Sequence, residues 1–280
     1  MKIEQFTVET YLGPNQHFSF ARKTLPAGVP DFAHTHDYYE VFLVERGKMR
    51  HWINGHVEVL DRGSLVFMRP NDSHALSAVD GTPCQIINIV FARETANHLV
   101  DRYGEEFDGL FFWTIRENPE TYLLRGARFE RAVNISQELQ TAHRSLARIE
   151  EYLLSLMTRV VDIPIEASQS IPPWLLKACT QARMPEVFRG GPAAFVRAAG
   201  RGHEHVSRVT KEHLGVTPSQ YINRLRMEHA ALLLSSDDWP VPLVAEDCGI
   251  ENLSHFYKVF RAQYGVTPRR YRQIHARTPV

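Results

Sequence analysis

Residues 205–221 read HVSRVTKEHLGVTPSQY, and residues 255–271, fifty positions later, read HFYKVFRAQYGVTPRRY. Seven of the seventeen aligned positions are identical, where unrelated sequences would share about one. Positive charge is also kept where Arg208 aligns with Lys258 and Lys211 with Arg261. The C-terminal part of the chain is therefore a duplicated unit.

Each copy predicts two short helices joined by a tight turn, the order of elements in a helix-turn-helix. A Gly ends the second helix, and a Thr-Pro pair begins the next one. Residues 193–199 form the first helix of the first copy, and residues 241–248 that of the second, where Gly249 allows the turn. Asn252 or Ser254 is expected to cap the helix that follows.

The ending of the second copy is a long pattern with fixed gaps, Phe256-x3-Phe260-Arg261-x3-Gly265-Val266-Thr267-Pro268-x2-Tyr271-Arg272. With the first copy and the helical segment between them, it resembles the AraC family of bacterial transcription regulators over roughly residues 190–273. Gly202 and Ile250 depart from the family, which usually has Ser and Phe there. The resemblance implies binding to a double-stranded DNA operator, with two recognition helices in successive major grooves about 34 Å apart.

Only outward-facing positions of the recognition helices are able to reach DNA. The helical period turns Val206, Val209, Phe256, Val259 and Phe260 toward the core. The candidates for base contacts are Glu204, Ser207, Arg208, Leu253, Ser254, His255 and Lys258, and those for phosphate contacts are Lys211, Arg261 and Arg269. An Arg at such a position binds guanine O6 and N7 with two hydrogen bonds.

The N-terminal part changes from a strand pattern to a helix pattern. Residues 17–91 predict a small all-β unit of short apolar or alternating runs, with Asn54-Gly55 as a hairpin turn. Helical spacing follows at residues 94–103, roughly 127–145 and 148–161. In the last of these, an apolar stripe is expected either to pack inward or to pair subunits; it consists of Ile149, Leu153, Leu156 and Val160.

These patterns predict an α+β protein of two domains, the N-terminal one a cupin-like β-barrel followed by helices and the C-terminal one all-α. The barrel is expected at residues 1–92 and a helical dimerisation and coupling segment at 93–163. Three prolines in a stretch poor in helix formers predict a linker at 164–176. The DNA-binding domain is then expected at 177–280.

The pattern Gly28-x5-His34-x-His36-x3-Glu40-x6-Gly47, followed by Gly63-x6-Pro70-x3-His74, resembles the two motifs of the cupin superfamily. The second motif differs by one residue of spacing and lacks the closing Asn. On one strand, the residues from His34 to Phe42 at even positions share a face, which is expected to line the barrel. His34, His36, Glu40 and His74 therefore predict a site for a divalent transition metal, Zn, Ni, Mn or Fe. The alternative is that these histidines hydrogen-bond a ligand directly.

Five aromatic residues are expected to line a pocket for a small-molecule effector, although a barrel core also needs large side chains. They are Tyr38, Phe42, Trp52, Phe67 and Phe91. The stretch HDYYE at residues 36–40, with Pro173-Trp174-Leu175, resembles the AraC-type regulators of chitooligosaccharide use. That resemblance implies an amino-sugar oligosaccharide as effector.

The net charge of zero conceals an asymmetry between the two parts. Residues 171–280 hold fifteen Lys and Arg against nine Asp and Glu, a balance of +6 that suits a polyanion, while the rest of the chain carries −6. Three cysteines without short spacing argue against disulfides, and no signal or membrane segment is seen, so we expect a cytoplasmic protein.

The sequence also leads us to expect several partners. They are operator DNA, the effector, RNA polymerase and a second copy of the chain in a homodimer; we do not expect binding to a membrane. Two other functions compete with this one. One competing hypothesis is a metal-dependent cupin enzyme, an oxygenase or isomerase, fused to the DNA-binding module. The other is an architectural DNA-binding protein that senses nothing.

Overall fold

The computed structural model describes residues 2–28, 32–79, 83–107, 109–114, 116–161, 171–236 and 239–275. They fall into two compact units, one that holds most of the strands and one that is mainly helical and whose helices follow Ile171. Most of the strands thus lie in one unit and the other is mainly helical, as the predicted α+β class requires.

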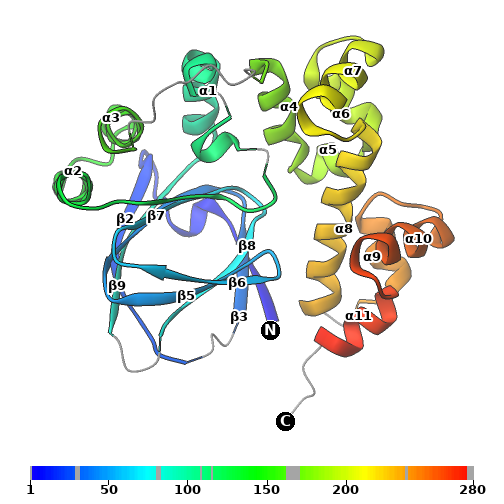
Figure 1. The fold of residues 1–280 in the computed structure, drawn as a ribbon, viewed down its shortest axis with the longest axis horizontal. Coiled ribbons are helices and arrows are strands. Elements are labelled where there is room, and N and C mark those ends of the chain that lie inside the picture. Colours follow the sequence, from blue (N-terminus) through cyan, green and yellow to red (C-terminus); the bar gives the residue numbers. More distant parts are fainter. Residues whose placement is uncertain are drawn as a thin grey trace. The chain divides into compact units, whose positions relative to one another are not determined.

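Two five-stranded sheets form the N-terminal unit (Figure 1). Their orders are β1-β3-β8-β5-β6 and β10-β7-β4-β9-β2. The strands are β1 Lys2–Phe6, β2 Phe18–Leu25, β3 Phe32–His36, β4 Tyr39–Arg46, β5 Lys48–Ile53, β6 His56–Asp61, β7 Ser64–Met68, β8 Ser73–Ala78, β9 Cys84–Phe91 and β10 Glu120–Leu123. The predicted hairpin is confirmed: β5 and β6 pair antiparallel across Asn54 and Gly55, whose φ angles are 46° and 87°.

Strand β4 has a hydrophobic core on each of its two faces. Phe42 and Val44 belong to a cluster with Met49, Ile53 and other residues between the sheets. Val41 and Leu43 belong to a second cluster, which the helices cover. Because side chains alternate along a strand, one β4 strand separates the barrel interior from the helical layer.

The helices of the N-terminal unit cover the outer face of the second sheet. They are the short 3₁₀ segment at Phe111–Trp113, α1 Arg93–Phe107, α2 Ala127–Thr141, and α3 Leu146–Ser155, which continues as a π-helix over Leu156–Val161. Another 3₁₀ segment, Val8–Thr10, follows β1. The apolar stripe around Leu153 is fully buried in the core beneath them. Of the two alternatives left by the sequence, the stripe therefore packs inward.

Strand β10 lies where the sequence pattern did not indicate it. It pairs with β7, so residues 120–123 return to the sheet from within the segment expected to be helical. Helix α4 begins at Pro173, so the last residues of the segment predicted as linker belong to a helix. Proline at the first helical turn is favourable, because its missing N–H has no partner there in any helix. Residues 162–170 lie outside the described residues.

The C-terminal unit contains two helix-turn-helix units joined by a long helix, α8 (Figure 1). The first uses α6 and α7, and the second uses α9 and α10, as the duplication predicts. The helices are α4 Pro173–Ala182, α5 Pro185–Arg189, α6 Gly191–Ala199, α7 His203–Leu214, α8 Pro218–Ser236, α9 Val241–Asp247, α10 Leu253–Tyr264 and α11 Pro268–His275.

The ends of the recognition helices follow the expected signals. Gly215 and Gly265 end α7 and α10 with φ angles of 69° and 74°. Of the two residues proposed to cap α10, Asn252 is the cap. Its side chain accepts a hydrogen bond from the His255 N–H at 2.9 Å.

Gly249 is expected to be far less tolerant of a side chain than Gly215, although both have positive φ angles. A Cβ atom at position 249 would lie 2.2 Å from the carbonyl oxygen of Arg189, whereas one at position 215 would have no atom of the described residues within 4 Å beyond its own stretch of backbone. Gly215→Ala should cost about 1 kcal/mol of unfolding free energy for the left-handed conformation alone. Gly249→Ala should cost about 1 to 3 kcal/mol more, because the backbone must move. Urea unfolding of both variants measures this, and equal costs would contradict the close approach.

Candidate metal centre and DNA-binding interface

The predicted metal ligands come from both sheets. His34 lies directly opposite His74 in the β3–β8 register, and His36 ends β3. The chain then bends at Asp37 and Tyr38 before β4 begins, so Glu40 belongs to the second sheet. The expectation of one continuous strand through this motif is therefore wrong. The bend nevertheless brings Glu40 to the histidines.

Three of the four predicted ligands form a compact group. The ligand atoms of His34, Glu40 and His74 all lie within 4.8 Å of one another. His36 lies beside this group, with its Nε2 atom 3.8 Å from Glu40 Oε2, while its Nδ1 atom is 2.8 Å from the Tyr38 carbonyl oxygen. A hydrogen bond to a carbonyl fixes Nδ1 as the donor and leaves Nε2 as a lone-pair acceptor.

Burial keeps these imidazoles neutral. His36 and His74 are fully buried, and desolvation lowers the pKa of His34 to about 3, that of His36 to about 4 and that of His74 well below its usual value. Desolvation also raises the pKa of Glu40 to about 7. The neutral imidazole is the form that binds a metal. With His36 neutral, its contact with Glu40 is not an ion pair.

Several ring nitrogens of this cluster are buried and have no hydrogen-bond partner among the described residues. His36 Nε2 and both ring nitrogens of His74 are inaccessible to solvent and have no hydrogen-bond partner among the described residues. Buried polar groups in native proteins are nearly always satisfied, so such atoms need a ligand, an ion or a water molecule. Neutral nitrogen donors with a carboxylate are a donor set that suits a divalent transition metal.

His51 is a further histidine of this interior that the motif reasoning missed. It shares a strand face with Ile53, which pairs with His74, and its ring centroid lies 5.8 Å from that of His74. Its Nδ1 atom is 2.8 Å from Glu58 Oε1, and its buried Nε2 atom has no partner in the part of the chain that the structure describes. A carboxylate that orients an imidazole is a common arrangement around metal sites. Side chains alternate between the two faces of β5, and this alternation was the sequence signal that the His51 side chain faces the barrel interior.

The Arg69–Asp72 pair holds the turn that leads into His74. Both side chains are buried, and Arg69 Nε and Nη2 donate to the two carboxylate oxygens at 2.9 and 3.0 Å. The guanidinium also donates to the carbonyl oxygens of Thr114, Arg116 and Glu117. The turn beside the histidines is therefore connected to the segment that precedes β10.

The five predicted pocket aromatics divide between different faces. Tyr38 stacks on His36 at 4.2 Å, and Phe42 meets the His51 ring edge to face at 5.5 Å, so both border the cluster. Phe67 and Phe91 both pack on Phe112 in the core beneath the helices. The structure contradicts the prediction that these two line the same pocket as the histidines, because their strand positions alternate to the other face.

Trp52 also lies apart from the cluster. It follows His51 on β5 and pairs with Val57 of β6, whose side chain is largely exposed. Its side chain is therefore on the outer face of the first sheet, away from the histidine-lined face. The structure does not bring it to the predicted pocket.

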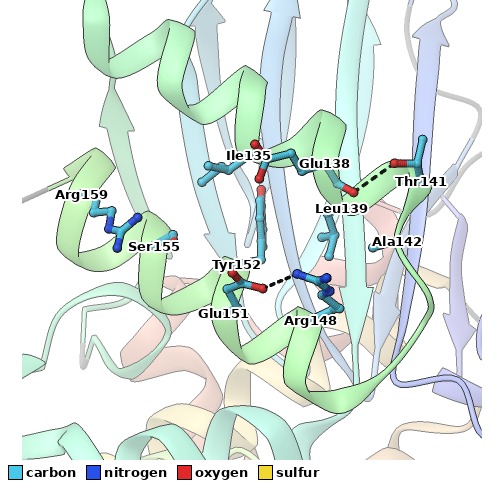
Figure 2. A pocket seen from close by; sticks show the side chains of 10 residues that line it. All are labelled: Ile135, Glu138, Leu139, Thr141, Ala142, Arg148, Glu151, Tyr152, Ser155 and Arg159. Carbon is cyan, nitrogen blue, oxygen red and sulfur yellow. Dashed lines mark hydrogen bonds and ion pairs between the residues drawn. The ribbon is translucent and has the colours of Figure 1, made fainter.

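A groove between α2 and α3, with a volume of about 380 Å³, was not indicated by the sequence (Figure 2). Its charged residues are partly paired with each other, as in the 2.8 Å contact between Arg148 Nη1 and Glu151 Oε2. The buried Tyr152 hydroxyl lies 3.1 Å from Ser136 Oγ. None of its ten lining residues, all of them described, has a buried polar side-chain atom without a partner, so we assign it no ligand.

The recognition helices face as the helical period predicts. Val206 and Val209 of α7 and Phe256 and Phe260 of α10 are buried, while Val259 is partly buried. The candidate DNA-contacting residues are exposed except for the partly buried Ser207; the exposed ones are Glu204, Arg208, Lys211, Leu253, Ser254, His255, Lys258, Arg261 and Arg269. Both helices therefore present polar and basic side chains outward.

Arg208 is engaged on its own helix. Its Nη1 atom is 3.2 Å from Glu212 Oε2, and its Nη2 atom is 3.4 Å from His205 Nδ1. All three side chains are exposed, so the pairing contributes little to stability. The guanidinium can exchange these partners for a base edge at small cost.

Two family models match the two parts of the chain. Residues 27–157 match an AraC-like ligand binding domain, and residues 195–274 match a helix-turn-helix domain. The chain is an AraC-type DNA-binding transcription regulator with a ligand-binding domain. The expected fold class and DNA-binding function are thereby confirmed. No helix in the described part of the chain is both long and apolar enough to span a membrane.

Relatives of this regulator match it over most of its length. It is 26% identical over 272 residues to the HTH-type transcriptional activator RhaS of Escherichia fergusonii, an alignment covering 93% of this chain and 94% of the relative. It is 27% identical over 252 residues to RhaS of Salmonella arizonae, covering 86% and 87%. Among solved structures, ToxT from Vibrio cholerae matches at 11% identity with a TM-score of 0.44, covering 93% of this chain and 99% of ToxT.

The metal-free regulator is expected to lose stability as the pH falls from 6.5 toward 4. In this range the unfolded chain protonates histidines that stay neutral in the folded state, such as His36 with its pKa of about 4. Glu40 acts in the opposite direction, because its folded-state pKa of about 7 favours the fold at lower pH. The lowered pKa values of the three histidines affect the stability more than the raised pKa of one carboxyl group.

Thermal unfolding in a chelator across this pH range measures the effect. His36→Gln should reduce the slope of stability against pH by nearly one proton. A stability that is independent of pH in wild type would contradict the neutral buried cluster.

Proposed function

We propose that this regulator senses a small molecule in its N-terminal barrel and that a divalent transition metal, Zn, Ni, Mn or Fe, assists the binding. The observation that carries the proposal is the group of His34, Glu40 and His74, in which both ring nitrogens of the buried His74 have no partner among the described residues. A cluster of this kind is costly to bury unless a ligand satisfies it.

The residues fit the metal in number and chemistry. His34, Glu40 and His74 would hold it, with His36 beside them and His51 oriented by Glu58. Bound there, the metal would supply a Lewis acid for lone pairs of the effector. Tyr38 and Phe42 add ring faces next to the polar group. A ring-bearing effector with hydroxyl or amino groups suits such a site, and we propose an amino-sugar oligosaccharide as its class.

The turn between β7 and β8 offers a route from this site to the helical layer. The Asn71 N–H donates to the His36 carbonyl oxygen at 2.8 Å. The neighbouring Arg69–Asp72 pair carries the hydrogen bonds to the segment before β10. An effector that binds more tightly to one arrangement of this turn would shift the population of the regulator toward it.

The relatives named transcriptional activators support activation rather than catalysis as the outcome. We therefore favour a regulator that contacts RNA polymerase at a promoter over a metal-dependent enzyme, and propose that it acts in the cytoplasm with its DNA. A homodimer stays a prediction. It would need a surface other than the stripe around Leu153, which is buried within the unit.

Metal binding is tested by isothermal titration of the chelator-treated protein with Zn²⁺. His34→Ala and His74→Ala should each weaken binding by more than about 100-fold, because even outer residues of metal sites contribute about 10- to 100-fold. The exposed His17→Ala serves as the control and should bind as wild type does. Wild-type affinity in both cluster variants, or no binding by wild type, would refute the metal.

DNA readout is tested with an operator selected from random sequences. Arg208→Ala should relax the preference at one base pair and cost about 1 to 3 kcal/mol there. Lys211→Ala should weaken binding to matched and mismatched sites alike and reduce the salt slope by about 1. Fluorescence anisotropy at several salt concentrations separates the two. Equal losses at matched and mismatched sites in both variants would refute this division of roles.

A further inference from the structure

A polar network connects the two helix-turn-helix units at a point away from their recognition helices. Arg189, the last residue of α5, lies on the side of the first unit, and Asp247, the last residue of α9, belongs to the second. Arg189 Nη2 donates to Asp247 Oδ1 at 2.5 Å, and Arg189 Nε donates to the Asp247 carbonyl oxygen at 2.7 Å. One guanidinium thus holds both the side chain and the backbone at the end of α9.

Helix α8 contributes two side chains to the same network. His229 Nε2 lies 2.7 Å from the other carboxylate oxygen of Asp247. Arg226, which is largely buried, donates from Nε to the Phe188 carbonyl oxygen and from Nη2 to that of Arg189, both at 2.7 Å. The ends of α5 and α9 are therefore fastened to each other and both to α8.

The backbone of the second unit also approaches the end of α5, which leads through Gly190 into the first unit. Gly249, in the turn after α9, approaches Arg189 so closely that a Cβ atom would lie 2.2 Å from its carbonyl oxygen. Hydrogen bonds from His229 and Arg189 hold the pKa of the Asp247 carboxyl below its usual value, so it is charged at neutral pH. Charge-assisted hydrogen bonds of this kind are stronger and more directional than neutral ones.

A helix such as α8 does not by itself fix the geometry of what it connects. Long helices bend, so a single connecting helix leaves the orientation of the two units free to vary. The contact between α5 and α9 is a second connection besides α8, and it restricts that movement. This matters because the two recognition helices must enter grooves that are about 34 Å apart.

We propose that Arg189 and Asp247 form a joint that fixes the spacing of the two recognition helices and so sets which separation of half-sites the regulator accepts. Asp247 is a positioning residue in this account, since it acts through α7 and α10. The inference rests on DNA binding by both units and is independent of the metal and the effector.

The test uses the full chain and the operator selected from random DNA, together with versions carrying one or two inserted base pairs between the half-sites. Each insertion moves the second half-site by about 3.4 Å along the axis and rotates it around the duplex. Fluorescence anisotropy gives the dissociation constant for each DNA. The quantity of interest is the insertion penalty, the ratio of the constants for the altered and the selected spacing.

Asp247→Ala and Arg189→Ala should each lower the insertion penalty at least about fivefold from its wild-type value, while weakening binding to the selected spacing. The double variant should behave like either single variant, because both remove the same contact. Glu246→Ala is the matched control: this exposed neighbour carries the same charge on the same helix, and its loss should leave the penalty unchanged.

One outcome would overturn the proposal, a wild-type insertion penalty in both joint variants. An equal loss of affinity at every spacing, which a general loss of stability would produce, gives this same result because it leaves the ratio unchanged. Should Asp247→Ala lose its cooperative thermal transition, Arg189→Lys carries the test, since it keeps the charge but lacks the planar fork that binds two acceptors.

Discussion

The DNA-binding unit depends on the burial of one helix, α8, in two separate cores. Near its start, Tyr221 packs on Phe195, and its hydroxyl donates to the Cys179 carbonyl oxygen, in the core of the first unit. Farther along, Met227 and Leu234 belong to the core of the second, with Phe256 and Phe260 of α10. Neither core can form without the helix that they share. The duplicated units are thereby held in a single structure, on which their joint reading of DNA depends.

The N-terminal unit has a corresponding constraint in the desolvation of its interior. Removing His36, His74 and Glu40 from water keeps the imidazoles neutral and leaves nitrogen atoms without partners among the described residues. Burying these polar groups is unfavourable, and the apolar clusters on both faces of the strands offset it. A ligand that satisfies the cluster stabilises the bound state, which is the thermodynamic requirement for a sensor.

Much of this could be predicted where the determinants are local. The repeat with its terminal Gly and Thr-Pro pair placed α7 and α10, and Asn252 was one of two residues proposed as the cap of α10. The histidine motif was expected on a strand that lines the barrel, and its residues do meet there, although the bend at Asp37 divides them between two sheets.

Features that depend on distant parts of the chain could not be predicted. The faces occupied by Phe67 and Phe91 follow from which sheet layer the helices cover. Strand β10 forms because β7 offers it an edge, and His51 joins the cluster through the register of β5 with β8. The Arg189–Asp247 contact joins residues 58 positions apart, a pairing that no local pattern indicates.

Hydroxyl-radical footprinting of the regulator on its selected operator would show whether α7 and α10 occupy successive major grooves on one face of DNA. Two protected segments are expected, with centres about 10 base pairs apart along the duplex. A single protected segment, or two segments on opposite faces, would contradict this arrangement.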